Sequence, residues 1–318
     1  MPPLPDPART PLTSAVAAEL AAPQPPVVRA FAAELAARGG GAVAGVLFYG
    51  SALRTGETDG LLDFYVLLDD VAAWNQSRFA SAGNRLLPPN VEYAESAGDA
   101  PRLRAKVAIM SVAQFARHAR ALSRDTTIWT RFCQPAALPY ARDEAAARAI
   151  TDAVATAVGA AAWWAAHLGP ERGPAAAFWT ALFQRTYASE LRVESAARPS
   201  SIVERAPERF ARMLTLGWAA EGVPFATETD GALSPRIAPE SRAKAAKAWA
   251  RRRRLAKPLN LARLAKAVFT FSGGVDYIAW KIERHSGHAI VVTPFQRRHP
   301  LLSAGPVLWR LWRRGVLR

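Results

Sequence analysis

Two apolar segments joined through a Gly-Ser pair constrain the fold more than any other feature of the chain. Residues 42–49 and 61–68 are almost wholly apolar, as expected of buried strands. Gly50 and Ser51 follow the first segment directly, and Asp63 stands near the start of the second. A Gly-Ser turn that leaves a buried strand exposes backbone N–H groups and a hydroxyl, and a carboxylate on the next strand can reach the same space. The pattern favours a site for phosphate groups and an oxygen-bound metal ion at one end of a sheet.

Spacing along the second segment shows what accompanies Asp63. Side chains alternate along a strand, so Asp63, Tyr65 and Asp69 share a face. At roughly 3.3 Å per residue, Asp69 lies about 20 Å from Asp63, too far to share an ion. Tyr65 stands two residues after Asp63 on the same face, the position from which a second carboxylate could reach the same ion. The alternative is an ordinary surface turn, with Ser51 as a helix cap and Asp63 as a strand-end residue, because short motifs often arise by chance.

Metal-binding and redox residues are scarce. The one cysteine, Cys133, excludes an intramolecular disulfide, and no Cys/His cluster has zinc spacing. Any metal is expected to have oxygen ligands, which favours Mg²⁺ at Asp63. His285 and His288 are interpreted as solvated or core residues.

Positive charge is concentrated at the C-terminal end. Residues 1–241 contain 23 Lys/Arg and 24 Asp/Glu, whereas residues 242–318 contain 18 Lys/Arg with only Asp276 and Glu283. This excess predicts a polyanionic partner, either a membrane rich in acidic lipid or a nucleic acid. The sequence contains no run of eighteen apolar residues, so no bilayer span is predicted. The Pro- and Ala-rich start lacks the pattern of a secretory signal and is interpreted as a frayed segment.

The last twelve residues, 307–318, have the pattern of an amphipathic helix. One side carries Leu308, Leu311, Trp312, Gly315 and Val316, and the other carries Arg310, Arg313, Arg314 and Arg318. This arrangement is typical of a helix lying in a lipid interface. The alternative is a helix packed on the protein with its basic face in solvent.

Periodicity and capping signals predict an α+β protein. We expect helices at 28–38, 70–82 (capped by Asp69 or Asp70), 112–122 (capped by Ser111), 143–167, 174–195, 207–220 and 241–256, and strands at 42–49, 61–68, 91–94 and 104–110. The strands predict a small mixed sheet with helices in residues 1–140. Residues 141–240 are expected to form a helical, winged-helix-like domain, followed by a basic region at 241–318.

Five aromatic residues of the middle region are expected to be part of the hydrophobic core. We expect them to form core rather than a platform on which bases stack; they are Trp163, Trp164, Phe178, Trp179 and Phe183.

Several separated segments together resemble the mitochondrial-type phosphatidate cytidylyltransferases, also described as translocator assembly and maintenance proteins, which have bacterial relatives. The corresponding segments are Tyr49-Gly50-Ser51, Asp63-Phe64-Tyr65, Asp69-Asp70 before Val71-Ala72-Ala73-Trp74, Lys106 to Ser111, Arg131 to Pro135, and Tyr187 to Arg192. The family also ends in a basic, Trp-containing helix. This chain departs from the family at three positions: Ala52 replaces a glycine, Gln134 replaces a lysine, and a glutamine shortly after the turn is absent. These differences bear on the specificity for lipid or nucleotide.

The resemblance implies a polymerase-beta-like nucleotidyltransferase domain that transfers CMP from CTP to phosphatidate in phospholipid biosynthesis, with Mg²⁺ as cofactor. It implies Asp63 as the catalytic metal ligand and Lys106 as a catalytic phosphate-neutralising residue, with nucleotide contacts from Tyr49, Gly50, Ser51, Tyr65 and Arg131. Lipid contacts would come from Arg192, Trp309, Arg310, Trp312, Arg313 and Arg314. The expected partners are CTP, phosphatidate and an acidic membrane surface, without nucleic acid. The expected location is cytoplasmic, peripheral on the inner face of a bacterial cell membrane.

Two other functions stay open from the residues. The chain could be a nucleotidyltransferase that acts on a soluble acceptor, although the basic tail is then unexplained. It could also be an inactive nucleotidyltransferase fold that binds nucleic acid through its arginines. The tail places its Trp and Arg residues on opposite faces, whereas grooves for nucleic acid place aromatic and basic side chains together.

Overall fold

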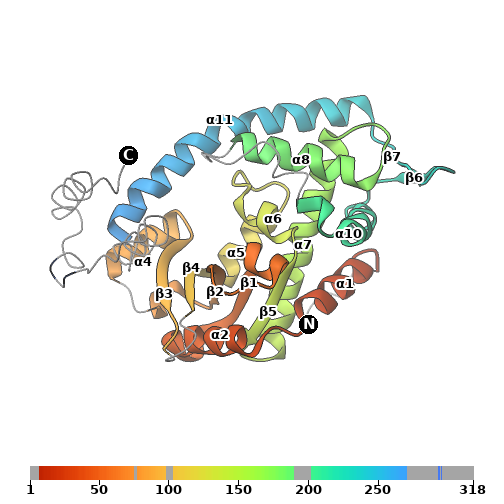
Figure 1. Cartoon of the computed structure of the whole chain (residues 1–318). Helices are drawn as coiled ribbons and strands as arrows, with labels where there is room; N and C mark the ends of the chain where they lie inside the picture. Colours follow the sequence, from red (N-terminus) through yellow and green to blue (C-terminus); the bar gives the residue numbers. More distant parts are fainter. Residues whose placement is uncertain are drawn as a thin grey trace, which may run out of the picture.

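A five-stranded mixed sheet forms the centre of the N-terminal half in a computed structural model of the chain, which describes residues 7–74, 77–97, 103–189, 202–270, 293 and 295 (Figure 1). The strand order is β3-β4-β2-β1-β5. Their bounds are Val43–Tyr49 (β1), Leu61–Leu68 (β2), Asn90–Glu95 (β3), Arg104–Ser111 (β4) and Ala136–Ala141 (β5). Only β2 and β4 are parallel, and the other neighbours are antiparallel.

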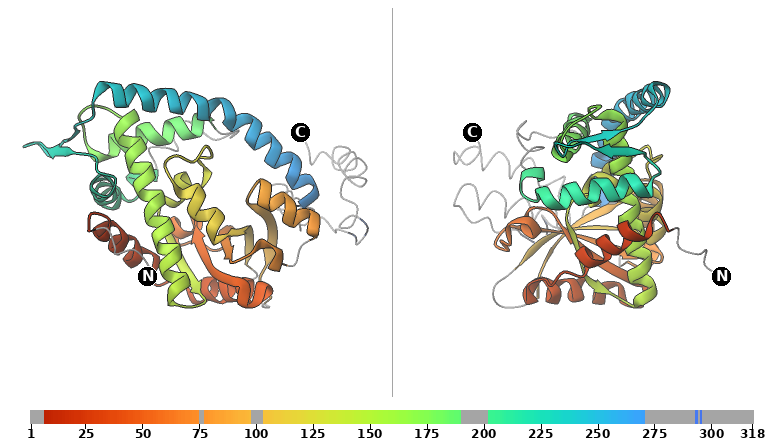
Figure 2. Two further views of the ribbon diagram at one scale, coloured as in Figure 1. Left: turned by 180° about the vertical axis from the view of Figure 1, so that it is seen from behind. Right: turned by 90° about the vertical axis from the view of Figure 1, so that its right-hand side faces the viewer.

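Helices cover both faces of this sheet, because β1 and β2 are apolar on both sides. Helix α2 (Pro26–Gly39) packs on one face, where its Phe31 meets Phe64. Helices α5 (Val112–Ala119), α6 (Thr127–Phe132) and α7 (Glu144–Leu168) lie on the other face, with Tyr65 and Leu67 in their core (Figure 2). The α+β class predicted from the sequence is confirmed.

The long alanine-rich helix α7 is the common support of the helical layer. It contacts α1 (Thr10–Leu20), α5, α6, α8 (Ala175–Ser189) and α10 (Pro207–Ala220). Gly217 of α10 lies so close to α7 that a Cβ there would be 2.5 Å from that of Ala162. By length and composition α7 could cross a membrane, and 72% of its most apolar window is buried inside the fold. Its packing accounts for its apolar composition.

Helix α1 connects the start of the chain to the helical layer. Glu19 accepts two hydrogen bonds from Arg209 of α10, with Nε–Oε2 at 2.5 Å and Nη2–Oε1 at 2.9 Å. Arg209 also donates to the carbonyl of Cys133, at 2.6 Å. The interpretation of the N-terminal segment as frayed is therefore wrong for residues 10–20.

The basic helix α11 (Pro239–Thr270) arches over the molecule and joins the helical layer to the sheet domain (Figure 1). Trp249 packs between Trp129 and Trp164, and the Arg252 guanidinium lies 4.5 Å from the centre of the Trp164 ring. Toward the other end α11 contacts β3 and α4 (Arg78–Leu86). The helix continues through Pro258 and is longer than the predicted 241–256, because its second half is held by contacts outside the helix.

Two further predictions differ from the structure. The helix expected at 70–82 is a 3-10 turn, Val71–Ala73 (η2), capped by Asp70, followed by a separate helix α4 that starts after the Ser77 cap. The interruption follows from Trp74, which is buried with its Nε1 donating to Glu92 at 3.1 Å. The chain also forms α1, α6, β5 and a small hairpin of β6 (Phe225–Thr227) and β7 (Leu233–Pro235), which were not predicted.

Several predicted elements do match. Besides β1 to β4 and α2, these are α5 with its Ser111 capping box, α7, α10 and the described part of α8. Four of the five predicted core aromatics are buried, and Trp163 is half-buried. The hydrophobic core runs from Leu47 and Tyr65 into α7, α8 and α10, across the boundary predicted between residues 140 and 141. The three-part domain division stays a prediction.

Candidate functional site

The Gly50-Ser51 turn places a backbone bend directly against Asp63. Gly50 has φ 94° and ψ −159°, a conformation that side chains rarely allow. A Cβ at residue 50 would lie 2.6 Å from Oδ2 of Asp63, so the carboxylate occupies the space that the missing side chain leaves. Ser51 begins the short helix α3 (Ser51–Thr55) and is exposed. The turn and the carboxylate predicted from the sequence therefore share one site.

A row of side chains continues from the turn across the sheet. Tyr49 pairs with Asp63, Asp63 with Lys106, and Lys106 with Tyr93, each on the neighbouring strand. Paired residues point to the same face, and neighbouring strands are about 4.8 Å apart. Asp63 is half-buried and Lys106 is exposed. The row thus presents a carboxylate and an ammonium group side by side, next to the turn.

Tyr65 has a different environment from the one predicted. It is 2% exposed, and its ring packs edge-on against Tyr49, Phe115 and Phe132. Burial raises the pKa of its hydroxyl, while the charge and hydrogen bond of Arg131 act in the opposite direction. The ring is enclosed by the core, so the prediction of Tyr65 as a nucleotide contact is corrected: its hydroxyl holds Arg131 in place.

Arg131 lies on α6, close to a contact that the sequence did not predict. One turn after Ser51, Arg54 donates to Oε1 of Gln134 at 3.4 Å, which ties α3 to the end of α6. Arg54 and Arg131 are both half-buried. Spacing on α3 could have indicated Arg54, which stands three residues after Ser51, but its partner lies 80 residues away. The contact links the turn to the segment that carries Arg131.

The donor set around Asp63 fits one kind of metal ion. Within the part of the chain that the structure describes, no group of three or more His, Cys, Asp or Glu side chains could hold a metal. Mg²⁺ commonly binds through one or two carboxylates, retained waters and substrate phosphates. Among the described residues, Asp63 could supply the protein carboxylate for Mg²⁺ that arrives with a nucleoside triphosphate, because phosphates and water would supply the other ligands.

Other predicted residues lie elsewhere. Asp69 is at the opposite end of β2, where its Oδ2 is 2.5 Å from Nη1 of Arg142, so it shares nothing with Asp63. Arg192 and the five tail residues Trp309, Arg310, Trp312, Arg313 and Arg314 lie outside the described residues. His285, His288 and the predicted helix 307–318 also lie outside them.

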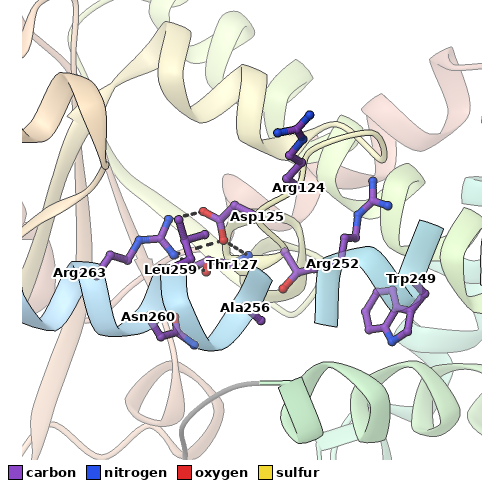
Figure 3. Close-up of a pocket in the computed structure, with 10 residues that line it drawn as sticks. Arg124, Asp125, Thr127, Trp249, Arg252, Ala256, Leu259, Asn260 and Arg263 are labelled. Carbon is purple, nitrogen blue, oxygen red and sulfur yellow. Dashed lines mark hydrogen bonds and ion pairs between the residues drawn. The ribbon is translucent and has the colours of Figure 1, made fainter. Parts of the chain in front are cut away.

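A small pocket between α11 and the start of α6 borders the same face of the sheet. Figure 3 shows Asp125 between Arg263 of α11 and Thr127. Asp125 is 8% exposed and pairs with Arg263, and its Oδ2 is 3.5 Å from Nδ1 of His118. Burial alone raises the pKa of this carboxyl, but the nearby His118 ring and the Arg263 guanidinium outweigh it and hold the pKa well below its usual range. Because these charges satisfy one another, the cluster fastens α11 to the sheet domain.

The chain matches no protein-family model, and no curated protein matches it. The site geometry and the order of the sequence motifs therefore carry the functional proposal.

Proposed function

We propose that this protein transfers CMP from CTP to phosphatidate, forming CDP-diacylglycerol and pyrophosphate. The observation that carries the proposal is the Asp63 carboxylate seated against the Gly50 turn, with Lys106 beside it on the next strand. The order of motifs that resembles the phosphatidate cytidylyltransferases supports the choice of substrates.

The reaction needs little from protein acids and bases. A phosphate oxygen of phosphatidate forms a bond to the α-phosphorus of CTP as the bond from that phosphorus to the β-phosphate bridging oxygen breaks. Pyrophosphate leaves with the electron pair. The phosphate monoester is already an anion, so no side chain must deprotonate it. Catalysis then depends on alignment and on neutralising charge.

Each residue of the site has a part in that scheme. CTP enters as its magnesium complex, which Asp63 would bind and whose ion would neutralise charge on the triphosphate. The backbone at Gly50 and Ser51 and the Ser51 hydroxyl would donate to triphosphate oxygens. Lys106 and Arg131 would offset the remaining negative charge, and Tyr65 would keep Arg131 oriented.

Access to a lipid substrate needs contact with the membrane. We assign this contact to the terminal segment, with Trp309 and Trp312 at headgroup level and Arg310, Arg313 and Arg314 on lipid phosphates. Each basic residue near an acidic surface contributes about 1 kcal/mol. Arg192 is a further candidate for the phosphate of phosphatidate.

Pyrophosphate release tests the proposal directly. We expect release with CTP, dependent on phosphatidate and Mg²⁺, and little with other ribonucleoside triphosphates. Asp63→Asn should abolish release and leave the thermal unfolding transition unchanged. Asp69→Asn is the matched control, because Asp69 lies on the same face at the far end of β2, and it should retain activity.

Each contrary result has a definite meaning. Release that does not depend on phosphatidate would indicate a soluble acceptor. Full turnover by Asp63→Asn would remove Asp63 from the site and end the proposal.

A further inference from the structure

Exposed hydrophobic side chains gather around α11. Leu122 is 86% exposed, Leu86 85% and Phe79 71%, and on α11 itself Leu261 is 63% and Leu255 45% exposed. Among the described residues, the remaining large exposed hydrophobics are Val27 on α2 and Phe295. Such clustering of apolar tips at a surface indicates a binding function.

Two partly buried contacts of α11 hold the segments next to the most exposed leucines in position. Arg252 donates to the carbonyls of Ala121 and Ser123, both at 2.9 Å, on either side of Leu122. Lys266 donates to the carbonyl of Leu87, next to Leu86, at 2.5 Å.

The geometry of α11 sets the spacing of these tips. Arg252 and Lys266 are nearly four turns apart, so both point to about the same side of the helix with about 21 Å between them. The segment that carries Leu122 and the C-terminal end of α4, which carries Leu86, are therefore both fixed along one helix.

Phe79 joins the same surface through α4. Phe79, Gly83 and Leu86 lie on one face of that helix, at spacings of four and three residues. A Cβ at Gly83 would be 3.5 Å from Cδ of Lys266, so this face borders α11. We call Phe79, Leu86, Leu122 and Leu255, with the basic residues around them, the α11 surface.

The charge of the α11 surface has one sign. The segments 78–86, 112–124 and 241–270 contain fifteen Lys/Arg and no Asp or Glu. The exposed cations include Arg78, Arg120, Arg124, Arg251, Arg254 and Lys257. Apolar tips surrounded by arginine and lysine fit an acidic lipid interface, where the apolar groups enter the acyl boundary and the cations meet phosphates.

The α11 surface also has a defined relation to the candidate site. Arg263 of α11 and its partner Asp125 both act electrostatically on the Tyr65 hydroxyl, which lies on the same sheet face as Asp63. A bilayer bound along α11 would therefore lie on the side of the molecule to which that face turns.

We propose that the α11 surface docks on acidic membranes, inserting Phe79, Leu86, Leu122 and Leu255. This contact is separate from the terminal segment and does not depend on which reaction the protein catalyses. A nucleic acid suits the surface less well, because bases stack on aromatic side chains and three of the four apolar tips are leucines.

Vesicle flotation of the full chain tests the proposal. Wild type, Leu86→Glu/Leu122→Glu and the control Val27→Glu are compared on vesicles of phosphatidylcholine alone and of equal parts phosphatidylcholine and phosphatidylglycerol. We expect wild type and Val27→Glu to bind only the acidic vesicles. The double variant should bind them at least about a hundredfold more weakly, because neither side chain can enter the acyl boundary once it is a glutamate.

Separate readouts distinguish this surface from the proposed reaction. All three proteins should unfold at the same temperature, because the changed leucines are exposed, and should release pyrophosphate equally with a dispersed short-chain phosphatidate. If the double variant binds acidic vesicles as tightly as wild type, the proposal is overturned. The same result is expected if residues 271–318 cover the α11 surface. A gel shift with RNA would overturn the proposal as well, if bound RNA prevents binding to vesicles and the double variant binds RNA as tightly as wild type.

Discussion

The Asp63 carboxylate lies where a side chain on Gly50 would stand, with Oδ2 2.6 Å from the position of that missing Cβ. Gly50 directly follows β1 and Asp63 lies on β2, and the register of β1 on β2 brings them together because Tyr49 pairs with Asp63. The turn that we propose for phosphate groups and the carboxylate that we propose for their metal ion therefore lie against each other.

Gly50→Ala should remove activity through this contact. The new Cβ would displace the Asp63 carboxylate and strain a backbone at φ 94° and ψ −159°, with the strain alone costing about 1–3 kcal/mol. We expect at least a hundredfold loss of pyrophosphate release. Gly56→Ala is the control, because Gly56 has φ 75° and nothing within 4 Å of its Cβ position. It should show the strain in urea unfolding and keep most activity; equal loss in both variants would contradict the assigned contact.

Tyr65→Phe tests whether the buried hydroxyl acts through Arg131. The ring and its packing stay, so only the bond to the guanidinium is lost, a bond worth about 1.5–3 kcal/mol when one partner is charged. We expect the KM for CTP to rise about tenfold with little change in kcat. In an Arg131→Met background the same substitution should have no further effect on KM. An undiminished effect there would show that Tyr65 acts by another route.

Asp125→Asn should loosen α11 and lower stability by about 3–5 kcal/mol, because the half-buried Arg263 would lose the carboxylate that neutralises its charge. Urea unfolding at neutral pH measures this loss. Asp125→Asn/Arg263→Met should recover part of it, since neither charge is then left alone.

The same pair predicts a pH dependence. The pKa of Asp125 is held below its usual value, so its ionised form stabilises the fold above the unfolded pKa of about 4, and this contribution is lost as pH falls. The stability difference between wild type and Asp125→Asn should shrink below about pH 4. A difference that grows in acid would contradict the assigned ion pair.

Deletion of residues 306–318 should separate membrane contact from chemistry. We expect a much larger loss of activity on phosphatidate in vesicles than on a dispersed short-chain phosphatidate. Equal loss on both substrates would argue against a membrane role for this segment.

Local patterns were sufficient for most of the sheet and for the centre of the site. The strands β1 and β2 are apolar throughout, Ser111 with Gln114 forms the capping box of α5, and Gly50, Ser51 and Asp63 are neighbours because consecutive strands usually pair. These elements depend on signals within a few residues of each other.

The missed elements depend on contacts between distant residues. β5 is short and contains Pro139, and it forms a strand because its backbone pairs with the edge of β1. The second half of α11 continues past Pro258 because Arg263 and Lys266 reach residues more than 130 positions earlier. The burial of Tyr65 follows from α5 and α6 closing over it, which no spacing around Asp63 reveals.

The bond between Glu19 and Arg209 joins residues that are 190 positions apart in the sequence. Helix α1 also packs on α7 and β5, and Glu19 accepts a hydrogen bond from the backbone N–H of Ala136. Arg209 therefore ties α10 to a helix that is already packed on the sheet domain, and α1 bridges the two parts of the fold. A chain cut short before residue 209 should expose α1 to protease more than the full-length chain does.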